Sequence, residues 1–210
     1  MDYNLSNNNQ KEENRNTPPN VPDNKFQDFI KKYLLVGWDL LKIILIALVI
    51  VLPIRYFLFQ PFIVKGESMV PNFQSGDYLI VDEISYRIGN PQRGDVVVLK
   101  YPLDPTQRYI KRIIGMPGET FEIQNGNIII SRDGKKLFLE ETGYLPLLSS
   151  TDGNVKVTLE ADEYFVLGDN RQFSYDSRRW GVLPRKDIIG KAIFRVFPLS
   201  MMTYISSPSY

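Results

Sequence analysis

The pattern of apolar and polar positions changes twice along the chain. Residues 1–24 are polar and rich in Asn and Pro, the stretch from Leu40 to Phe59 is almost wholly apolar, and the remainder alternates in short runs. The first segment cannot bury enough apolar surface to offset the entropy lost on ordering, so we predict that residues 1–24 form a disordered tail. It also lacks the apolar core of a cleavable leader.

Residues 25–59 are predicted to form an amphipathic lead-in followed by a single transmembrane helix. In the lead-in, Phe26, Phe29 and Tyr33 recur at helical spacing. From Leu40 onward the apolar run of about 20 residues is long enough to cross a hydrocarbon core of roughly 30 Å. The alternative is a buried helix of a soluble domain, but a small β domain offers little room to bury such a helix.

Charge around the apolar run predicts its orientation. Within this run the span Ile43–Ile54 is free of charge; Lys25, Lys31, Lys32 and Lys42 precede it, whereas only Arg55 and Lys65 follow it closely. Because cytoplasmic flanks carry the excess of Lys and Arg, we expect a single-pass plasma-membrane protein with a cytoplasmic N-terminus. The large C-terminal part would then lie on the extracytoplasmic face, periplasmic or outer.

Beyond the apolar run, seven short runs with strand-like composition are separated by turns rich in Gly, Asp and Pro. The predicted strands are Tyr78–Asp82, Val96–Lys100, Tyr109–Ile114, Thr120–Gln124, Asn127–Ser131, Glu163–Leu167 and Ile188–Phe197. The pair Asn125-Gly126 favours a type I′ hairpin turn. Strands at this spacing, without intervening helices, predict a mainly β fold in which antiparallel strands form a barrel-like or sandwich domain.

We assign this domain to residues 60–200 and expect a C-terminal tail at residues 201–210. Asp104–Gln107 and Glu140–Val157 are predicted to be irregular loops, because neither segment shows a sustained periodic pattern.

The composition removes several kinds of chemistry. The chain has no histidine and no cysteine, and its formal net charge is +1. His-based triads and thiol nucleophiles are therefore excluded, and the ordinary ligands of zinc, haem and iron–sulfur clusters are missing. We expect no metal and no cofactor, and the charge gives no basic field for binding nucleic acid.

A serine activated by a neutral lysine remains possible, and Ser68 and Lys111 are candidates. Ser68 lies in a loop entered through Gly66, which allows a close backbone approach. Lys111 lies in a β-like run whose alternation places Lys111 and Arg112 on opposite faces, so one of the two is expected to face the interior. The same pattern also fits an edge-strand lysine that faces solvent.

A lysine can act as a base only when it is neutral. Its pKa must fall from about 10.4 to about 7–8, which burial without a carboxylate partner can achieve. We therefore predict that no Asp or Glu contacts the Lys111 ammonium group.

A third cluster, residues 168–181, is dense in Gly, Asn, Ser, Asp and Arg. This composition fits either an organised functional loop or a charged turn with ordinary ion pairs.

Five ordered blocks resemble the bacterial type I signal peptidases, which are membrane-bound Ser/Lys endopeptidases. The blocks are residues 66–71 (GESMVP), 76–81 (GDYLIV), 93–98 (RGDVVV), 109–119 (YIKRIIGMPGE) and 168–181 (GDNRQFSYDSRRWG). Together they follow a membrane anchor and extend the resemblance to Phe197. The resemblance implies a serine endopeptidase that removes signal peptides from preproteins.

The resemblance also assigns roles to individual residues. Ser68 would be the nucleophile and Lys111 the general base, with Ser174 orienting the Lys111 amine. Asp176 and Arg178 would form a supporting ion pair, and Gly168 would leave space beside the lysine.

Further roles implied by the resemblance concern the oxyanion hole and the substrate pockets. The backbone N–H of Ser68 would supply one oxyanion donor. Many members of the family have a serine where this chain has Gly66, so a second donor from that side chain is in doubt. Asn72 and Phe73 also depart from the usual Thr and Leu.

Two shallow apolar pockets would accept small side chains at the residue before the scissile bond and two residues before that, the small-x-small pattern. The residues implied to line them are Phe62, Val64, Met69, Phe73, Tyr109 and Ile110. The substrate would bind as an added strand. Ser68 follows Phe59 by nine residues, a reach of at most about 30 Å, so the site would lie near the lipid bilayer.

Other functions explain fewer of these features. Self-cleaving bacterial stress repressors share the Ser/Lys chemistry, but they are soluble and bind DNA. A catalytically silent, membrane-anchored scaffolding domain does not require Ser68 and Lys111, and both are present. A membrane-tethered adhesion module predicts none of the blocks.

Overall fold

The computed structural model describes residues 25–53, 59–147, 149–208 and 210. Its long helix α1 spans Lys25–Pro53 and is, within the described residues, the one helix long and apolar enough to cross a membrane, with a mean hydropathy of 2.6 over its most apolar window. The predicted lead-in from residue 25 lies in α1, but Phe59 begins strand β1 and does not end the helix. The expected disordered tail, residues 1–24, lies outside the described residues.

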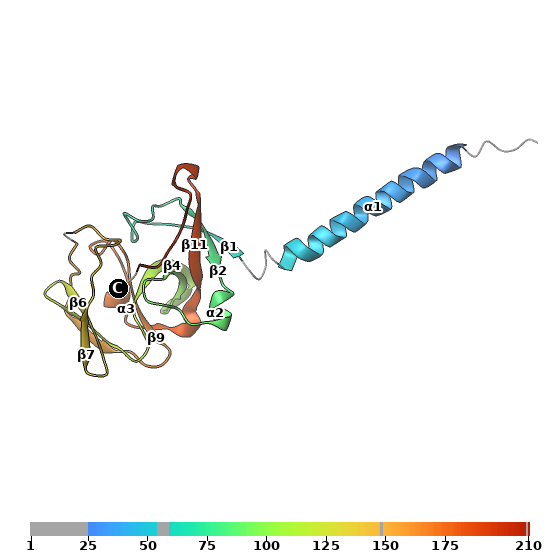
Figure 1. Cartoon of the computed structure of the whole chain (residues 1–210). Coiled ribbons are helices and arrows are strands. Elements are labelled where there is room, and N and C mark those ends of the chain that lie inside the picture. Colours follow the sequence, from blue (N-terminus) through green and yellow to red (C-terminus); the bar gives the residue numbers. More distant parts are fainter. Residues whose placement is uncertain (1–24, 54–58, 148, 209) are drawn as a thin grey trace, which may run out of the picture. The chain divides into compact units, whose positions relative to one another are not determined.

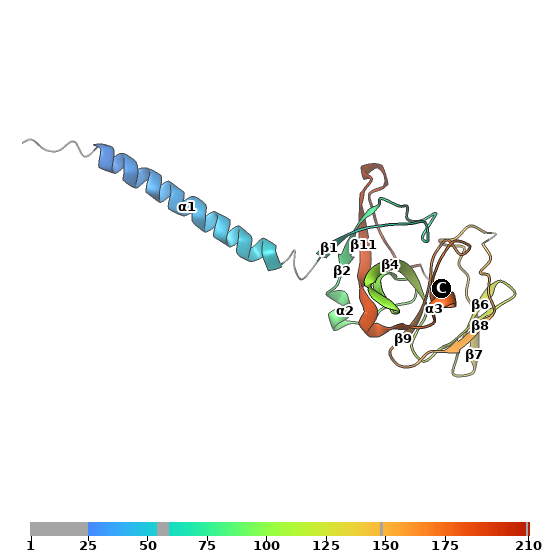
Figure 2. The same cartoon turned by 180° about the vertical axis from the view of Figure 1, so that it is seen from behind.

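A β body follows α1 and contains two antiparallel sheets (Figures 1 and 2). The larger sheet has eight strands in the order β1–β2–β11–β3–β4–β9–β10, with β12 paired to β11, and the smaller has the order β7–β6–β5–β8. The strands are β1 Phe59–Ile63, β2 Tyr78–Asp82, β3 Val96–Tyr101, β4 Asp104–Gly115, β5 Thr120–Gln124, β6 Asn127–Arg132, β7 Lys135–Phe138, β8 Val155–Thr158, β9 Glu163–Leu167, β10 Leu183–Pro184, β11 Ile188–Phe197 and β12 Thr203–Tyr204. The mainly β, antiparallel fold class is confirmed.

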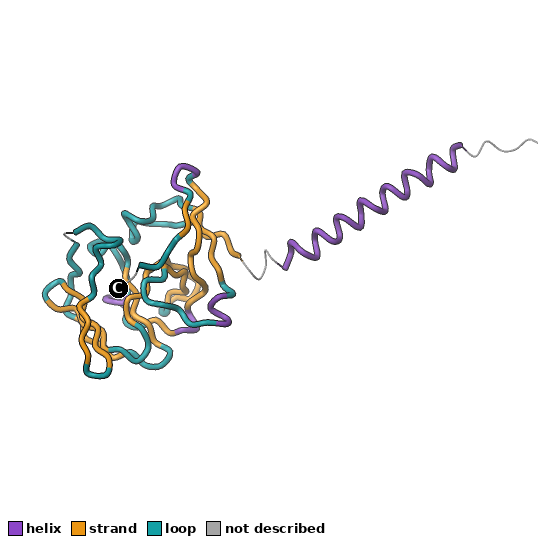
Figure 3. The backbone as a smooth tube through the Cα atoms, viewed as in Figure 1, coloured by secondary structure: helices purple, strands orange, loops and turns teal. Residues whose placement is uncertain are grey.

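Helical structure in the body is confined to single turns between strands (Figure 3). These turns are α2 Ser85–Ile88, α3 Ser177–Trp180, η2 Arg185–Asp187 and η3 Leu199–Met201. All seven predicted strands are present, and three of them are longer than predicted. The hairpin between β5 and β6 has Asn125 and Gly126 at φ 52° and 81°, which is the positive-φ pair that a type I′ turn requires.

One predicted loop is wrong and a second is partly wrong. Asp104–Gln107 is the first part of β4, where Asp104 pairs with Tyr101 of β3. Val155–Thr158 forms β8 because it adds to the edge of β5, with Val157 opposite Phe121. Backbone pairing to a distant strand, which local composition does not report, decides both cases.

The expected C-terminal tail is also partly incorporated into the fold. Thr203 and Tyr204 pair with β11, and Ile205 is buried in an apolar cluster that contains Met69 and Ile110. Ser207 donates a hydrogen bond to the buried Asp95 carboxylate at 2.5 Å. These residues therefore complete the core beside the candidate site.

Candidate active site

The candidate base lies on β4, an interior strand of the larger sheet. Lys111 pairs with Val97 of β3, and its neighbour Arg112 pairs with Leu167 of β9. Both basic side chains are 3% exposed. The prediction that one of the two would face the interior is confirmed for Lys111, and Arg112 is buried as well because both faces of β4 are covered. The alternative of a solvent-facing edge lysine is wrong.

The candidate nucleophile lies in the loop between β1 and β2. Gly66 enters this loop with φ +87°, a conformation that favours glycine. On the other side of Ser68, the Met69 side chain is 1% exposed and anchors the loop in the core. Asn170 also holds the loop, because its backbone N–H donates to the Ser68 carbonyl at 3.0 Å and its side-chain amide donates to the Glu67 carbonyl at 3.0 Å.

The structure brings Ser68 and Lys111 into direct contact. Lys111 Nζ donates to Ser68 Oγ at 2.7 Å and to the Ile110 carbonyl at 3.0 Å. No carboxylate of the described residues forms an ion pair with this amine. If the amine is neutral, the same contact allows the Ser68 hydroxyl to donate its proton to nitrogen.

Burial controls the protonation of the lysine. It lowers the pKa of the Lys111 amine from 10.5 to about 8, although Asp176 and Asp169 raise that pKa through their charge at a distance. The Tyr109 ring lies 5.3 Å from Nζ and covers it on one side. Near pH 8 about half of the molecules would therefore hold a neutral Lys111.

Gly168 leaves space for Ser174 and for the Ser68 backbone, because a Cβ atom at this position would collide with Ser174 Oγ and with the Ser68 carbonyl oxygen. Ser174 Oγ is itself buried and has no hydrogen-bond partner among the described residues. The hydrogen bond from Ser174 to Lys111 that the resemblance implies is therefore not formed in this structure.

The Asp176–Arg178 ion pair lies behind Ser174. Arg178 Nε donates to Asp176 Oδ1 at 2.8 Å, and Asp176 Oδ2 accepts from the Gly168 N–H at 3.0 Å. Asp176 thus fixes the backbone of Gly168 and caps the short helix α3. The Asp176–Arg178 pair therefore stabilises the 168–181 loop, since neither side chain contacts Lys111.

A second buried ion pair was not expected from the sequence. Arg112 donates to Asp169 through Nε at 2.8 Å and through Nη2 at 2.6 Å, and Asn72 donates to Asp169 Oδ2 at 2.8 Å. Arg112 lies in β4, Asp169 in the 168–181 loop, and Asn72 in the loop between β1 and β2 that carries Ser68, which we call the nucleophile loop. Two consecutive basic residues lie in a strand that is enclosed on both faces. This pattern would have predicted the ion pair, because a buried arginine requires an anion.

An open cleft of about 520 Å³ exposes the contact between Ser68 and Lys111. Phe62, Tyr109 and Ile110 are among its lining residues. The other three residues implied as pocket walls, Val64, Met69 and Phe73, do not line this cleft and are buried in the cluster with Ile110. These three residues pack behind the cleft wall and do not form its surface, so the expectation that they line the substrate pockets is corrected.

The Ser68 backbone N–H has no acceptor among the described residues, and an oxyanion could therefore bind there. The Gly66 N–H, by contrast, donates to Ser75 Oγ at 3.4 Å. Within the described ranges, no group of three or more acidic side chains is placed to hold a metal ion.

A serine hydroxyl bonded to a buried lysine, with a free N–H beside it, has the parts of a serine hydrolase site. The family model described as signal peptidase, peptidase S26, matches residues 37–197. The chain therefore belongs to the signal peptidase S26 family, and it is a serine peptidase.

Known relatives agree with this assignment. Probable signal peptidase I-1 of Synechocystis sp. is 39% identical over 186 residues, which cover 81% of this chain and 89% of that protein. Signal peptidase I P of Bacillus subtilis subsp. natto is 39% identical over 182 residues, which cover 83% and 95%. A crystal structure of a signal peptidase I from Enterococcus faecalis is 29% identical and covers 49% of this chain and 97% of that chain, with a TM-score of 0.41, which is too low to bear on the fold.

Proposed function

We propose that this chain removes signal peptides from preproteins with a Ser68/Lys111 dyad. The observation that carries the proposal is the 2.7 Å contact between Lys111 Nζ and Ser68 Oγ, made by a lysine that is 3% exposed and has no carboxylate partner. Burial provides a lysine with a lowered pKa, and the contact provides the path for the proton.

In the acylation step, neutral Lys111 takes the Ser68 proton as Oγ attacks the scissile carbonyl carbon. The carbonyl oxygen becomes an oxyanion, to which the Ser68 N–H donates a hydrogen bond; a donor of this kind typically contributes about 2.7–4 kcal/mol. Lys111 then gives its proton to the departing amine, and the C–N bond breaks. The products are the free mature chain and an ester between Ser68 and the signal peptide.

In the deacylation step, Lys111 is neutral again and takes a proton from a water molecule that attacks the ester. Collapse of the second tetrahedral intermediate releases the signal peptide as a carboxylic acid, and the proton returns to Ser68 Oγ. Asn170 holds the Ser68 loop throughout, because its backbone N–H donates to the Ser68 carbonyl, and the absence of a side chain at Gly168 leaves room for that carbonyl oxygen.

The cleft supports the proposed preference for small-x-small sites. Phe62, Tyr109 and Ile110 make part of its wall apolar, and Phe62 and Ile110 pack against the buried cluster behind the cleft, which resists displacement. We expect a small side chain immediately before the scissile bond, since a larger one would have to displace packed core atoms.

The proposed topology places α1 across the plasma membrane with the peptidase body on the extracytoplasmic face. The lysine excess before the apolar run supports this orientation. Near the cleft, Ile63, Tyr78 and Phe197 face one another across β1, β2 and β11 and are 42%, 42% and 52% exposed. Such a row of exposed apolar side chains fits contact with a bilayer.

The test is incubation of the detergent-solubilised chain with a preprotein that carries an Ala-x-Ala site. The wild type should release the signal peptide at that site, and both Ser68→Ala and Lys111→Ala should not. Lys111→Arg should be inactive too, because a guanidinium group stays protonated.

Cleavage by a folded Lys111→Ala variant would show that a different base operates. Absence of cleavage by a folded wild type would instead favour a silent, membrane-anchored scaffolding domain. Trapping the Ser68 ester by rapid acid quench, and its absence in Ser68→Ala, tests the acyl-enzyme separately.

A further inference from the structure

Three cations gather beside the substrate cleft. Lys100 of β3 and Arg108 of β4 are register partners, so their side chains extend from the same face of the hairpin. Lys65 and Arg108 both line the cleft. All three side chains are exposed, and we refer to Lys65, Lys100 and Arg108 as the cationic rim.

The cationic rim has no internal counter-charge. None of the three side chains forms a hydrogen bond or ion pair with any described residue, and no carboxylate of the described residues lines the cleft. The nearest acids along the chain are Glu67 and Asp104. Glu67 forms no ion pair, and Asp104 accepts hydrogen bonds from Thr106 and Gln107.

This arrangement lowers the stability of the isolated hairpin, since like charges placed directly opposite each other on neighbouring strands repel. If these charges served only to keep the end of the hairpin solvated, residues of opposite charge could face each other. The smaller sheet has such a pair, in which Lys156 Nζ lies 3.3 Å from Glu122 Oε2. The uncompensated positive charge therefore points to an anionic partner outside the chain.

Apolar side chains accompany the cations. Leu103, in the turn between β3 and β4, is 70% exposed, and Ile63, which also lines the cleft, is 42% exposed. Exposed apolar side chains flanked by Lys and Arg are typical of surfaces that bind the interface of a membrane containing anionic lipid.

We propose that the cationic rim binds the headgroups of anionic phospholipids, with Leu103 inserted between them. The proposal rests on the membrane-anchored peptidase proposed above. Lys65 follows the end of α1 at Pro53 by twelve residues, a reach of at most about 40 Å, so the chain itself keeps the rim near the bilayer.

A lipid explains the rim better than the preprotein does. The small-x-small pattern proposed for this cleft requires small side chains at two positions and does not require an anion. Anionic headgroups bound at the rim would hold the mouth of the cleft against the bilayer surface, where the scissile bond of an anchored signal peptide is presented.

The test uses the full chain reconstituted in vesicles of phosphatidylcholine alone, or of phosphatidylcholine with phosphatidylglycerol. Because the chain has no cysteine, Leu103→Cys gives a single site for a polarity-sensitive dye. We expect a blue-shifted emission only with phosphatidylglycerol, reversed by high salt through screening. In this labelled background, Lys100→Gln or Arg108→Gln should each weaken docking about fivefold, the factor expected for one basic residue at an anionic surface.

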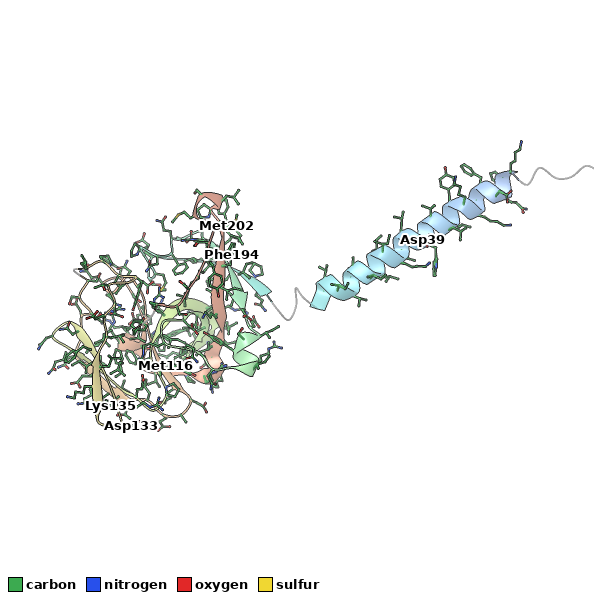
Figure 4. The ribbon with its side chains drawn as sticks, in the orientation of Figure 1. Asp39, Met116, Asp133, Lys135, Phe194 and Met202 are labelled. Carbon is green, nitrogen blue, oxygen red and sulfur yellow. The ribbon has the colours of Figure 1, made fainter. Side chains whose placement is uncertain are left out.

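The matched control is the double change Lys135→Gln with Lys136→Gln in β7, at the edge of the smaller sheet, where Lys135 is labelled in Figure 4. This variant loses two exposed lysines outside the rim and should dock like the wild type. Equal docking of the wild type to both vesicle types, or equal loss in the control, would overturn the proposal.

Two further readouts separate this inference from the proposed function. Cleavage of a preprotein by the wild type in detergent tests the peptidase, whatever the vesicles show. If Arg108→Gln instead changes the preference between acidic and neutral peptides in detergent, without altering docking, the rim contacts the substrate and the lipid proposal is wrong.

Discussion

Arg112 and Asp169 form a two-pronged ion pair in the interior of the body, with N–O distances of 2.8 and 2.6 Å. The pair ties the strand that carries Lys111 to the loop that carries Gly168 and Ser174. Asn72 extends the connection to the nucleophile loop by donating to the same carboxylate. The relative position of Ser68, Lys111 and the 168–181 loop thus depends on one buried carboxylate.

Asp169→Asn should therefore destabilise the body strongly. It leaves the Arg112 guanidinium buried without an anion, and breaking such a pair typically costs about 3–5 kcal/mol. Urea unfolding of the solubilised chain measures the loss. The control is Asp133→Asn, whose partner Arg132 is 62% exposed, and which should change little. Equal unfolding midpoints for the two variants would contradict the structural role of the pair.

Gly168→Ala should abolish cleavage. The new methyl group would collide with Ser174 Oγ and the Ser68 carbonyl oxygen, so one of these elements must shift. A displacement of about 1 Å can cost about 100-fold in rate. Gly143→Ala is the matched control, because open space surrounds that position. Rates are compared on an Ala-x-Ala preprotein, and a wild-type rate for Gly168→Ala would show that the space beside Ser68 is not needed.

Lys111→Met should be inactive yet more stable at neutral pH. Burial lowers the pKa of Lys111 from 10.5 to about 8, so below pH 8 the folded state carries a charge that it disfavours relative to the unfolded state. That difference corresponds to about 3 kcal/mol. The penalty is constant below the folded pKa and disappears as pH rises from about 8 to above 10.5, because there the unfolded state binds more protons.

Denaturant unfolding at pH 7 and at high pH measures this effect. The stability gained by Lys111→Met over the wild type should shrink as pH rises through this window. If the difference in unfolding free energy between Lys111→Met and the wild type stays the same at all pH values, Lys111 is not desolvated.

Tyr109→Ala should move the acidic limb of the rate profile to higher pH. The ring lies 5.3 Å from Lys111 Nζ, and its removal admits water, which favours the charged amine and raises its pKa. Tyr109→Phe keeps the ring and should leave the limb in place. A loss of rate in Tyr109→Ala without any movement of the limb would restrict Tyr109 to binding the substrate.

Much of the body could be predicted because its strands carry local signals. Tyr78–Asp82 and Glu163–Leu167 have bounds that agree with the structure, since turn residues flank alternating or apolar runs. Five strands were missed, namely β1, β7, β8, β10 and β12. Of these, β7 and β8 are four-residue edges whose pairing is decided by β6 and β5. Ile205 was missed for a similar reason, because its burial depends on distant core residues.

The site shows the same division. Ser68 and Lys111 could be identified because their residue types and motifs indicate chemistry, whereas Asn72 and Asp169 meet only through the folding of three separate segments. The sequence also could not show that Ser174 would be left without a partner. Hydrogen-bond geometry of this kind depends on side-chain placement within a packed interior.

The most direct test of the dyad is the pH dependence of kcat/KM for the wild-type chain on a peptide without titrating groups. The rate should rise with pH as Lys111 loses its proton, with a single acidic inflection near its pKa of about 8. Lys111→Arg should show no activity across the same range. A profile that is flat from acid to alkaline pH, or an active Lys111→Arg variant, would contradict a lysine base.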